Sequence, residues 1–270
     1  MKFLQIIFLV LFNLSLSIGV QASGEVAING STTVLPVVQK TAEAYLEKHP
    51  SATLAISGGG SGNGIKALID GLCDIAMASR DVSPKEIKLA KANNVNLTKF
   101  VVAIDALIPV VHLSNPIDNL SLSQLADVYS GKVRKWEEIG GIDKRIAVIS
   151  RDTSSGTYET WQERVLGKTR VSPGALLQAS SGAIVQTVGG NRCALGYIGF
   201  GYVNATLKTL SIDGIEPTEE NALSGKWPIA RELYLFTNGE PKGDAKAYID
   251  YVLSKEGQVL VKSVGFIPLK

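Results

Sequence analysis

Apolar residues along the chain alternate between short runs typical of buried strands and segments in which they recur every three or four positions, as in amphipathic helices. The runs 26–29, 53–57 and 74–78 predict strands, and each is followed by a helical pattern. In 65–72, for example, four apolar side chains stand at i, i+3, i+4 and i+7. Repeated strand–helix units of this length predict an α/β protein with a mostly parallel sheet and helices on both faces.

The second half of the chain repeats this plan. It begins after a long apolar run, 100–113, that is interrupted by Asp105 and Pro109. A last strand and a long closing helix are expected near the end, where they can return to the first half beside the long run. The further elements that the pattern predicts are helices at 121–130, 158–166 and 245–253 and strands at 146–150, 194–200 and 232–237.

This return predicts a discontinuous first domain with a second domain inserted into it. We expect residues 23–105 together with 231–270 to form the first domain and residues 106–230 to form the second. Two domains joined in this way leave a cleft between them, and ligands commonly bind in such a cleft.

The first 22 residues have the pattern of a cleavable secretory signal peptide. Lys2 precedes an apolar stretch from Phe3 to Val20, and Val20-Gln21-Ala22 places small residues at the −3 and −1 positions of a cleavage site. An uncleaved membrane anchor is the alternative, and the shortness of the stretch disfavours it. We therefore expect cleavage after Ala22 and a secreted mature protein.

Charge and cysteine content narrow the classes of function. The chain has 27 lysines and arginines against 25 acidic residues, a net charge of +2 that falls to +1 when Lys2 is removed. A chain so balanced has no long-range field for nucleic acid or an anionic membrane, so any anion must be held by local geometry.

Cys73 and Cys193 can pair in a secreted protein, but their apolar surroundings favour free thiols. Since His49 and His112 are the only histidines, we expect no metal site and no cofactor.

Three clusters of hydroxyl residues and glycine stand just ahead of predicted helices: Gly30–Thr33, Gly60–Gly64 and Ser154–Thr157. A helix start leaves its first N–H groups unpaired at the positive end of the dipole, so small residues there make an anion site. The alternative for each cluster alone is ordinary capping. Three clusters, with Arg151 four residues ahead of Ser155, predict a site that surrounds one small oxyanion.

The segment 58–64 has five glycines in seven residues, which cost conformational entropy and contribute no packing. They predict that the backbone approaches another group closely. The segment is not a nucleotide loop, because Gly-x-Gly-x-x-Gly fits no register and no Lys-Ser/Thr follows. It is not a nucleophile elbow either, because Asn63 occupies the place of the last glycine.

Two charged segments are candidates for contact with the anion. Arg151 offers a planar, always charged fork for two oxyanion oxygens; the alternative is a surface arginine paired with Asp152 or Glu159. Ser79-Arg80-Asp81 ends the third strand at the carboxyl edge, where open α/β sheets place ligands. A carboxylate there would accept a hydrogen bond from a protonated ligand, and the alternative is a solvated ion pair.

Short motifs follow one another through nearly the whole chain after residue 22, in the order Gly30-Ser31-Thr32, Gly60–Ile65, Asp74–Arg80, Gly131-Lys132, Trp136, Gly140-Gly141, Arg151-Asp152, Ser155–Thr157, Ala194–Tyr197 and Gly265–Leu269. Their set and order resemble those of the phosphate-binding proteins of bacterial ABC importers, the PstS-like family. The resemblance implies a type II periplasmic-binding-protein fold, with two α/β domains that close over a dehydrated phosphate. It also implies a periplasmic location, no catalysis, and an importer's membrane permease and ATPase subunits as partners of a monomer.

The resemblance also implies which residues bind the ligand. The long members of the family have an aspartate directly after the serine that matches Ser79, whereas this chain has Arg80 there, followed by Asp81. It is therefore open whether Asp81 accepts the ligand proton and whether Arg80 touches the anion. The expected ligand residues are Ser31, Thr32, Thr33, Ser61, Ser79, Arg80, Asp81, Arg151, Ser155, Gly156 and Thr157.

Three alternatives to phosphate transport stay open at this point. A secreted phosphatase-like enzyme is disfavoured by the lack of a metal-ligand cluster and of a base paired with any serine. A binding protein for sulfate, molybdate or tungstate would use the same donors without the protonated oxygen. A binding protein recruited as a sensor or an adhesion factor would have the same motifs.

Overall fold

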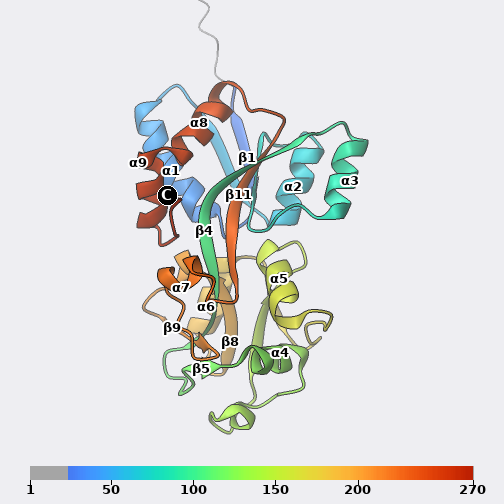
Figure 1. Cartoon of the computed structure of the whole chain (residues 1–270), viewed down its shortest axis with the longest axis vertical. Helices are drawn as coiled ribbons and strands as arrows, with labels where there is room; N and C mark the ends of the chain where they lie inside the picture. Colours follow the sequence, from blue (N-terminus) through green and yellow to red (C-terminus); the bar gives the residue numbers. More distant parts are fainter. Residues whose placement is uncertain (1–23, 270) are drawn as a thin grey trace, which may run out of the picture.

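Two long strands, β4 (Leu97–His112) and β11 (Ala230–Asn238), run between the two lobes of the computed structural model, which describes residues 24–269 (Figure 1). The first part of β4 pairs antiparallel with β11. Its last part pairs antiparallel with β8 (Ala194–Gly199) and β9 (Leu207–Thr209) in the other lobe. One continuous strand therefore belongs to both lobes and joins their sheets.

The first lobe has the strand order β2-β1-β3-β11-β4. Helices α1, α8 and α9 cover one face of this sheet, and α2 and α3 cover the other (Figure 1). Alternate residues of β3 explain this division, because Ile75 and Met77 point to the first group of helices and Ala76 and Ala78 to the second. The bounds are β1 Val26–Gly30, β2 Leu54–Gly58, β3 Ile75–Ala78, α1 Leu35–Lys48, α2 Ser61–Ile69, α3 Pro84–Ala92, α8 Gly243–Leu253 and α9 Lys255–Ser263.

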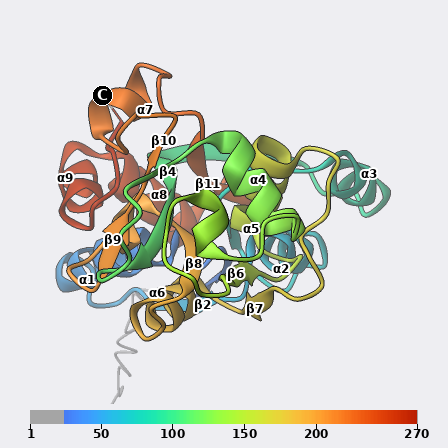
Figure 2. The same ribbon diagram turned by 90° about the horizontal axis from the view of Figure 1, so that it is seen from below.

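The second lobe has the strand order β4-β8-β6-β7, with helices on both faces (Figure 2). Gly196 of β8 lies against α6, whereas the ring of its neighbour Tyr197 stacks on Trp161 of α5 at 4.3 Å between centroids. Successive residues of one strand thus hold the helices on opposite faces. The bounds are β6 Ala147–Arg151, β7 Leu176–Gln178, α4 Leu122–Ser130, α5 Gly156–Trp161 and α6 Ser181–Gly189, with the small elements β5 Asn119–Leu120, β10 Ser211–Ile212 and α7 Glu219–Leu223.

The α/β class and the two-lobed architecture predicted from the sequence are confirmed. The sheet is mixed, however, because β4 and β11 run antiparallel to their neighbours at the centre while the outer strands are parallel. Helix α6 was not predicted, nor was α9 after the expected closing helix. The helix predicted over 158–166 changes to a π-helical turn after Trp161. Cys73 and Cys193 are both free.

The predicted signal peptide, residues 1–22, lies outside the described residues. Within 24–269, the structure has no helix long and apolar enough to cross a membrane. That same part of the chain has no group of three or more histidine, cysteine or acidic side chains placed to hold a metal ion.

Candidate functional site

The candidate site lies where four helix starts, two from each lobe, come together. Strand β1 leads into α1 and β2 into α2 in the first lobe, while β6 leads into α5 and β7 into α6 in the second. Because these pairs of strands are parallel, their carboxyl ends lie at one edge of each sheet. The helix starts of both lobes therefore face one another.

Arg151, the last residue of β6, is the buried cation of this site. Its side chain is 1% exposed, and Nε donates to the carbonyl of Gln178 (2.9 Å) while Nη2 donates to that of Ala179 (3.0 Å). Among the described residues, the nearest carboxylate is Asp152, with Oδ2 at 4.0 Å from Nη2. Burial lowers the pKa of this guanidinium. A buried cation without a close counter-ion is costly, and a bound anion would offset that cost.

Four hydroxyl groups from both lobes gather beside this guanidinium, and all are buried. Thr33 Oγ1 lies 2.7 Å from Thr157 Oγ1 across the interface and 3.3 Å from Ser181 Oγ. Thr32 Oγ1 accepts from Ser181 N (3.2 Å), and Arg151 Nη1 donates to Ser181 Oγ (3.3 Å). Because a hydroxyl can both donate and accept, these four groups can hydrogen-bond to one another in this structure and donate to an anion when one is bound.

A second pair of hydroxyls belongs to the first lobe. Ser61 Oγ accepts from Ser79 N (3.1 Å) and lies 3.3 Å from Ser79 Oγ. The first residue of α5, Gly156, comes so close that an added Cβ would lie 2.4 Å from Ser61 Oγ. The N–H groups of Gly156 and Thr157 open α5 and have no acceptor within the helix. The two halves of the candidate site are thus in direct contact.

Ser155 is the N-cap of α5, and Ser31 stabilises the turn that precedes α1, whose N-cap is Val34. Ser31 Oγ accepts from Thr33 N (3.2 Å), and Ser155 Oγ accepts from Tyr158 N (3.2 Å). Both side chains are buried. Their hydroxyls therefore accept from backbone N–H groups ahead of α1 and in α5. This is the role that the capping alternative predicts for these two residues.

Arg80 and Asp81 do not belong to this hydroxyl cluster. Arg80 is bound by two carboxylates, Glu86 and Glu159, and Asp81 Oδ2 lies 2.6 Å from Lys99 Nζ. The side chain of Asp81 is 52% exposed. The structure thus brings together the predicted residues Ser31, Thr32, Thr33, Ser61, Ser79, Arg151, Ser155, Gly156 and Thr157, and it places Asp81 outside them.

Three residues of the site were not predicted. Ser181 opens α6, and Ser180-Ser181-Gly182 repeats the Ser-Ser-Gly of 154–156, so a motif search would have found it. Asp105 and Arg231 are register partners on β4 and β11 and form a buried ion pair of 2.8 Å. Arg231 Nη2 also donates to Thr157 Oγ1 (3.1 Å). Burial raises the pKa of Asp105, and the guanidinium of Arg231 opposes that shift.

The glycines of 58–64 allow close backbone contacts, as the sequence predicts. An added Cβ at Gly60 would lie 2.9 Å from the carbonyl oxygen of Ser154 in the other lobe, and Gly62 N donates to that oxygen (2.9 Å). At Gly64 an added Cβ would lie 2.5 Å from Gly30 Cα. The groups that these glycines approach are therefore the opposite lobe and strand β1.

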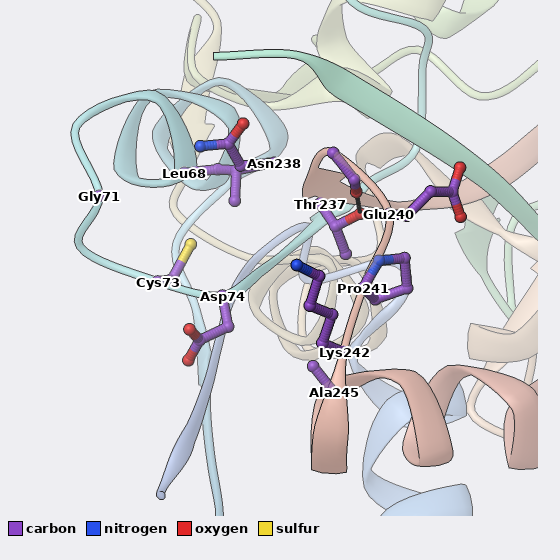
Figure 3. A pocket seen from close by; sticks show the side chains of 11 residues that line it. Leu68, Gly71, Cys73, Asp74, Thr237, Asn238, Glu240, Pro241, Lys242 and Ala245 are labelled. Atoms are coloured by element: carbon purple, nitrogen blue, oxygen red, sulfur yellow. Dashed lines mark hydrogen bonds between the residues drawn. The ribbon is translucent and has the colours of Figure 1, made fainter. Parts of the chain in front are cut away.

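A separate cavity of about 720 Å³ opens elsewhere in the first lobe, between the end of α2 and the segment that precedes α8 (Figure 3). Cys73, Asp74 and Lys242 are among its lining side chains, and burial raises the pKa of the Cys73 thiol to about 11. None of the predicted ligand residues lines it. The cavity is thus distinct from the hydroxyl cluster between the lobes.

Comparison with known proteins places these features in a family. Residues 17–256 match the family model described as a PBP superfamily domain. The chain is 32% identical to the phosphate-binding protein PstS of Bacillus subtilis (92% of this chain, 82% of that protein) and 30% identical to PstS of Borreliella burgdorferi (91% and 90%). A substrate-binding protein of Clostridium perfringens, solved with bound phosphate, superposes with a TM-score of 0.86 at 35% identity (92% of this chain, 100% of that chain). An ABC-type phosphate transport receptor of Vibrio cholerae has a TM-score of 0.73 at 31% identity (90% and 100%).

Proposed function

This chain belongs to the PBP superfamily and within it to the PstS phosphate-binding proteins, and on that premise we propose that it binds inorganic phosphate between its lobes and delivers it to an ABC importer. The observation that carries the proposal is Arg151, a buried cation without a close counter-ion beside hydroxyls of both lobes. A dehydrated phosphate must exchange its hydration shell for many directed donors. The helix starts of this site offer such donors from several directions.

The proposed phosphate shell combines the two lobes. Ser31 and Ser155 take part indirectly, because their hydroxyls already accept from Thr33 N and Tyr158 N and so order the turns that carry the other donors. Asp81 is left out because its carboxylate is exposed and paired with Lys99. The proposed shell is Thr32, Thr33, Ser61 and Ser79 from the first lobe and Arg151, Gly156, Thr157 and Ser181 from the second.

Closure of the lobes would assemble this shell. The proposed domains are 23–105 with 231–270, and 106–230. Two hydrophobic clusters of the first lobe and one of the second fall almost entirely within these ranges, which supports the division. Since donors of both lobes meet only in the closed form, phosphate would shift the equilibrium toward closure.

The proposal includes a periplasmic monomer, released by cleavage after Ala22, that docks on the permease and ATPase subunits of an importer. It includes no catalysis. The two histidines lie apart from the hydroxyl cluster, because His49 stacks on Tyr45 and His112 Nδ1 bonds Ser114. With no histidine beside them, and with Asp105 paired to Arg231, the buried serines and threonines are proposed as donors rather than nucleophiles.

A thermal-shift series tests the proposed function. At a phosphate concentration about a hundredfold above Kd, the unfolding temperature of the mature protein should rise by roughly 5–10 °C. Sulfate, molybdate and tungstate at the same concentration serve as the comparison. A shift with one of these anions and none with phosphate would assign the protein to a different oxyanion. Release of phosphate from an aryl phosphate would instead favour the enzyme.

Replacing Asp81 by asparagine should leave the phosphate affinity within about twofold of that of the wild-type protein, since an exposed ion pair on one lobe contributes little. Titration calorimetry at pH 6 and pH 8 measures this, because the fraction of monobasic phosphate differs between the two. Lys99→Gln, which breaks the same ion pair from its other side, is the matched control. A loss specific to Asp81→Asn would identify this carboxylate as the acceptor of the ligand proton.

A further inference from the structure

Arg80 lies between two carboxylates, one from each lobe. Its Nη1 and Nη2 donate to the two oxygens of Glu86, both at 2.8 Å, within the first lobe. Its Nε lies 2.7 Å from Glu159 Oε2, on helix α5 of the second lobe. Both Nη atoms are thus hydrogen-bonded to one carboxylate, while the buried Nε faces the other at ion-pair distance without a hydrogen bond, so the charge of Arg80 is already balanced by carboxylates.

The first lobe holds Arg80 in this orientation by itself. Glu86 accepts from the backbone N–H of Ser83 (2.7 Å) and from its hydroxyl (2.9 Å), as part of the capping box of α3. Arg80 Nη1 also donates to the carbonyl of Asp81 (2.9 Å). The first lobe thus holds Nη1 and Nη2 of Arg80 by its own contacts. Nε is therefore already oriented toward the second lobe before the lobes come together.

The contact with Glu159 joins elements that belong to different lobes. Nearby, Gly62 N donates to the carbonyl of Ser154, and Ser154 Oγ donates to the carbonyl of Gly59 (3.4 Å), also across the interface. The side chain of Arg80 is 11% exposed and that of Glu159 is 35% exposed. The ion pair is therefore mostly buried at Arg80 and partly open to solvent at Glu159.

From these contacts we infer that Arg80 is a positioning residue, and that the Arg80–Glu159 ion pair between the lobes sets the lifetime of the closed phosphate complex. The inference rests on the proposed function. A charge pair that forms late in closure slows reopening, so its effect falls on the dissociation rate more than on association. Arg80 thus acts on phosphate through the lobes and not as a ligand.

Stopped-flow measurement of phosphate release from the full mature protein tests this inference. Glu159→Gln should release phosphate roughly tenfold faster, with an association rate within about twofold of wild type. Raising the salt concentration should speed release from the wild-type protein more than from the variant, because the ion pair is open to screening. Glu163→Gln is the matched control, since Glu163 follows on the same segment, is exposed and contacts Arg164 of its own lobe.

A double-mutant cycle separates the positioning role from direct binding. If Arg80 acts through Glu159, Arg80→Gln adds little to the effect of Glu159→Gln. If Arg80→Gln weakens phosphate binding by the same factor in both backgrounds, Arg80 is a ligand and the inference is overturned. An unchanged release rate in Glu159→Gln also overturns it, while the proposed function stands. If the wild-type protein binds no phosphate, the proposed function itself fails. Unfolding temperatures without phosphate show whether each variant is folded.

Discussion

Replacing Arg151 by alanine should abolish measurable phosphate binding, with a loss of affinity of about a thousandfold or more, corresponding to ~4 kcal/mol. Within residues 24–269, this guanidinium is the charge beside the hydroxyl cluster that has no carboxylate closer than 4.0 Å, since Arg231 binds Asp105 and Arg80 binds Glu86. Hydroxyls alone would have to replace the hydration of a doubly charged anion among buried side chains. Titration calorimetry with phosphate measures the loss.

Arg151→Lys refines this prediction. Lysine keeps the charge but cannot donate to Gln178 and Ala179 while also facing the anion, so we expect an intermediate affinity, about a hundredfold below wild type. Arg164→Ala, at an exposed arginine of the same lobe, is the control and should bind normally. Melting curves without phosphate show whether the alanine variant is folded. A folded Arg151→Ala protein that binds phosphate with wild-type affinity would remove the basis of the proposed site.

Most strands and helices of this fold could be predicted because their signals are local. The apolar runs of β1 and β3 and the helical spacing in α1 and α2 depend only on neighbouring residues. The hydroxyl–glycine clusters were equally clear, because a helix start needs such residues at fixed positions. The antiparallel centre of the sheet was harder to predict. Strand β11 follows β4 by more than a hundred residues, and its direction depends on the course of the chain between them.

The roles of the charged residues could not be predicted in the same way. Arg80 and Asp81 are adjacent in sequence, but one is held by Glu86 and Glu159 and the other by Lys99. These partners lie on three different elements, and the sequence does not indicate which of them each side chain meets. The same holds for Asp105 and Arg231, whose pairing depends on the register of two distant strands. Spacing along the chain thus predicted the helix starts of the candidate site better than the ion pairs around it.

The glycines link a local sequence signal to contacts between residues that lie far apart in the chain. The entropic cost of the glycines in 58–64 predicts a close approach, and the structure identifies the partner as the opposite lobe at Gly60 and Gly62. Gly156, outside that segment, makes the same kind of contact. Closure to this distance brings Thr33 within 2.7 Å of Thr157. A larger residue at these positions should therefore lower the phosphate affinity, because it would obstruct the contact between the lobes without disturbing either lobe alone.

Gly156→Val should accordingly lower the phosphate affinity by roughly a hundredfold while the ligand-free protein keeps its unfolding temperature. An added Cβ would lie 2.4 Å from Ser61 Oγ and 2.9 Å from both Ser79 Oγ and Arg80 Cγ, so the lobes could not reach their present separation. Small-angle scattering should show that saturating phosphate compacts the wild-type protein but not the variant. Gly59→Ala is the matched control, since an added Cβ there meets only Asn29 Oδ1 at 3.8 Å. A Gly156→Val protein that compacts and binds like the wild type would show that phosphate does not require lobes this close.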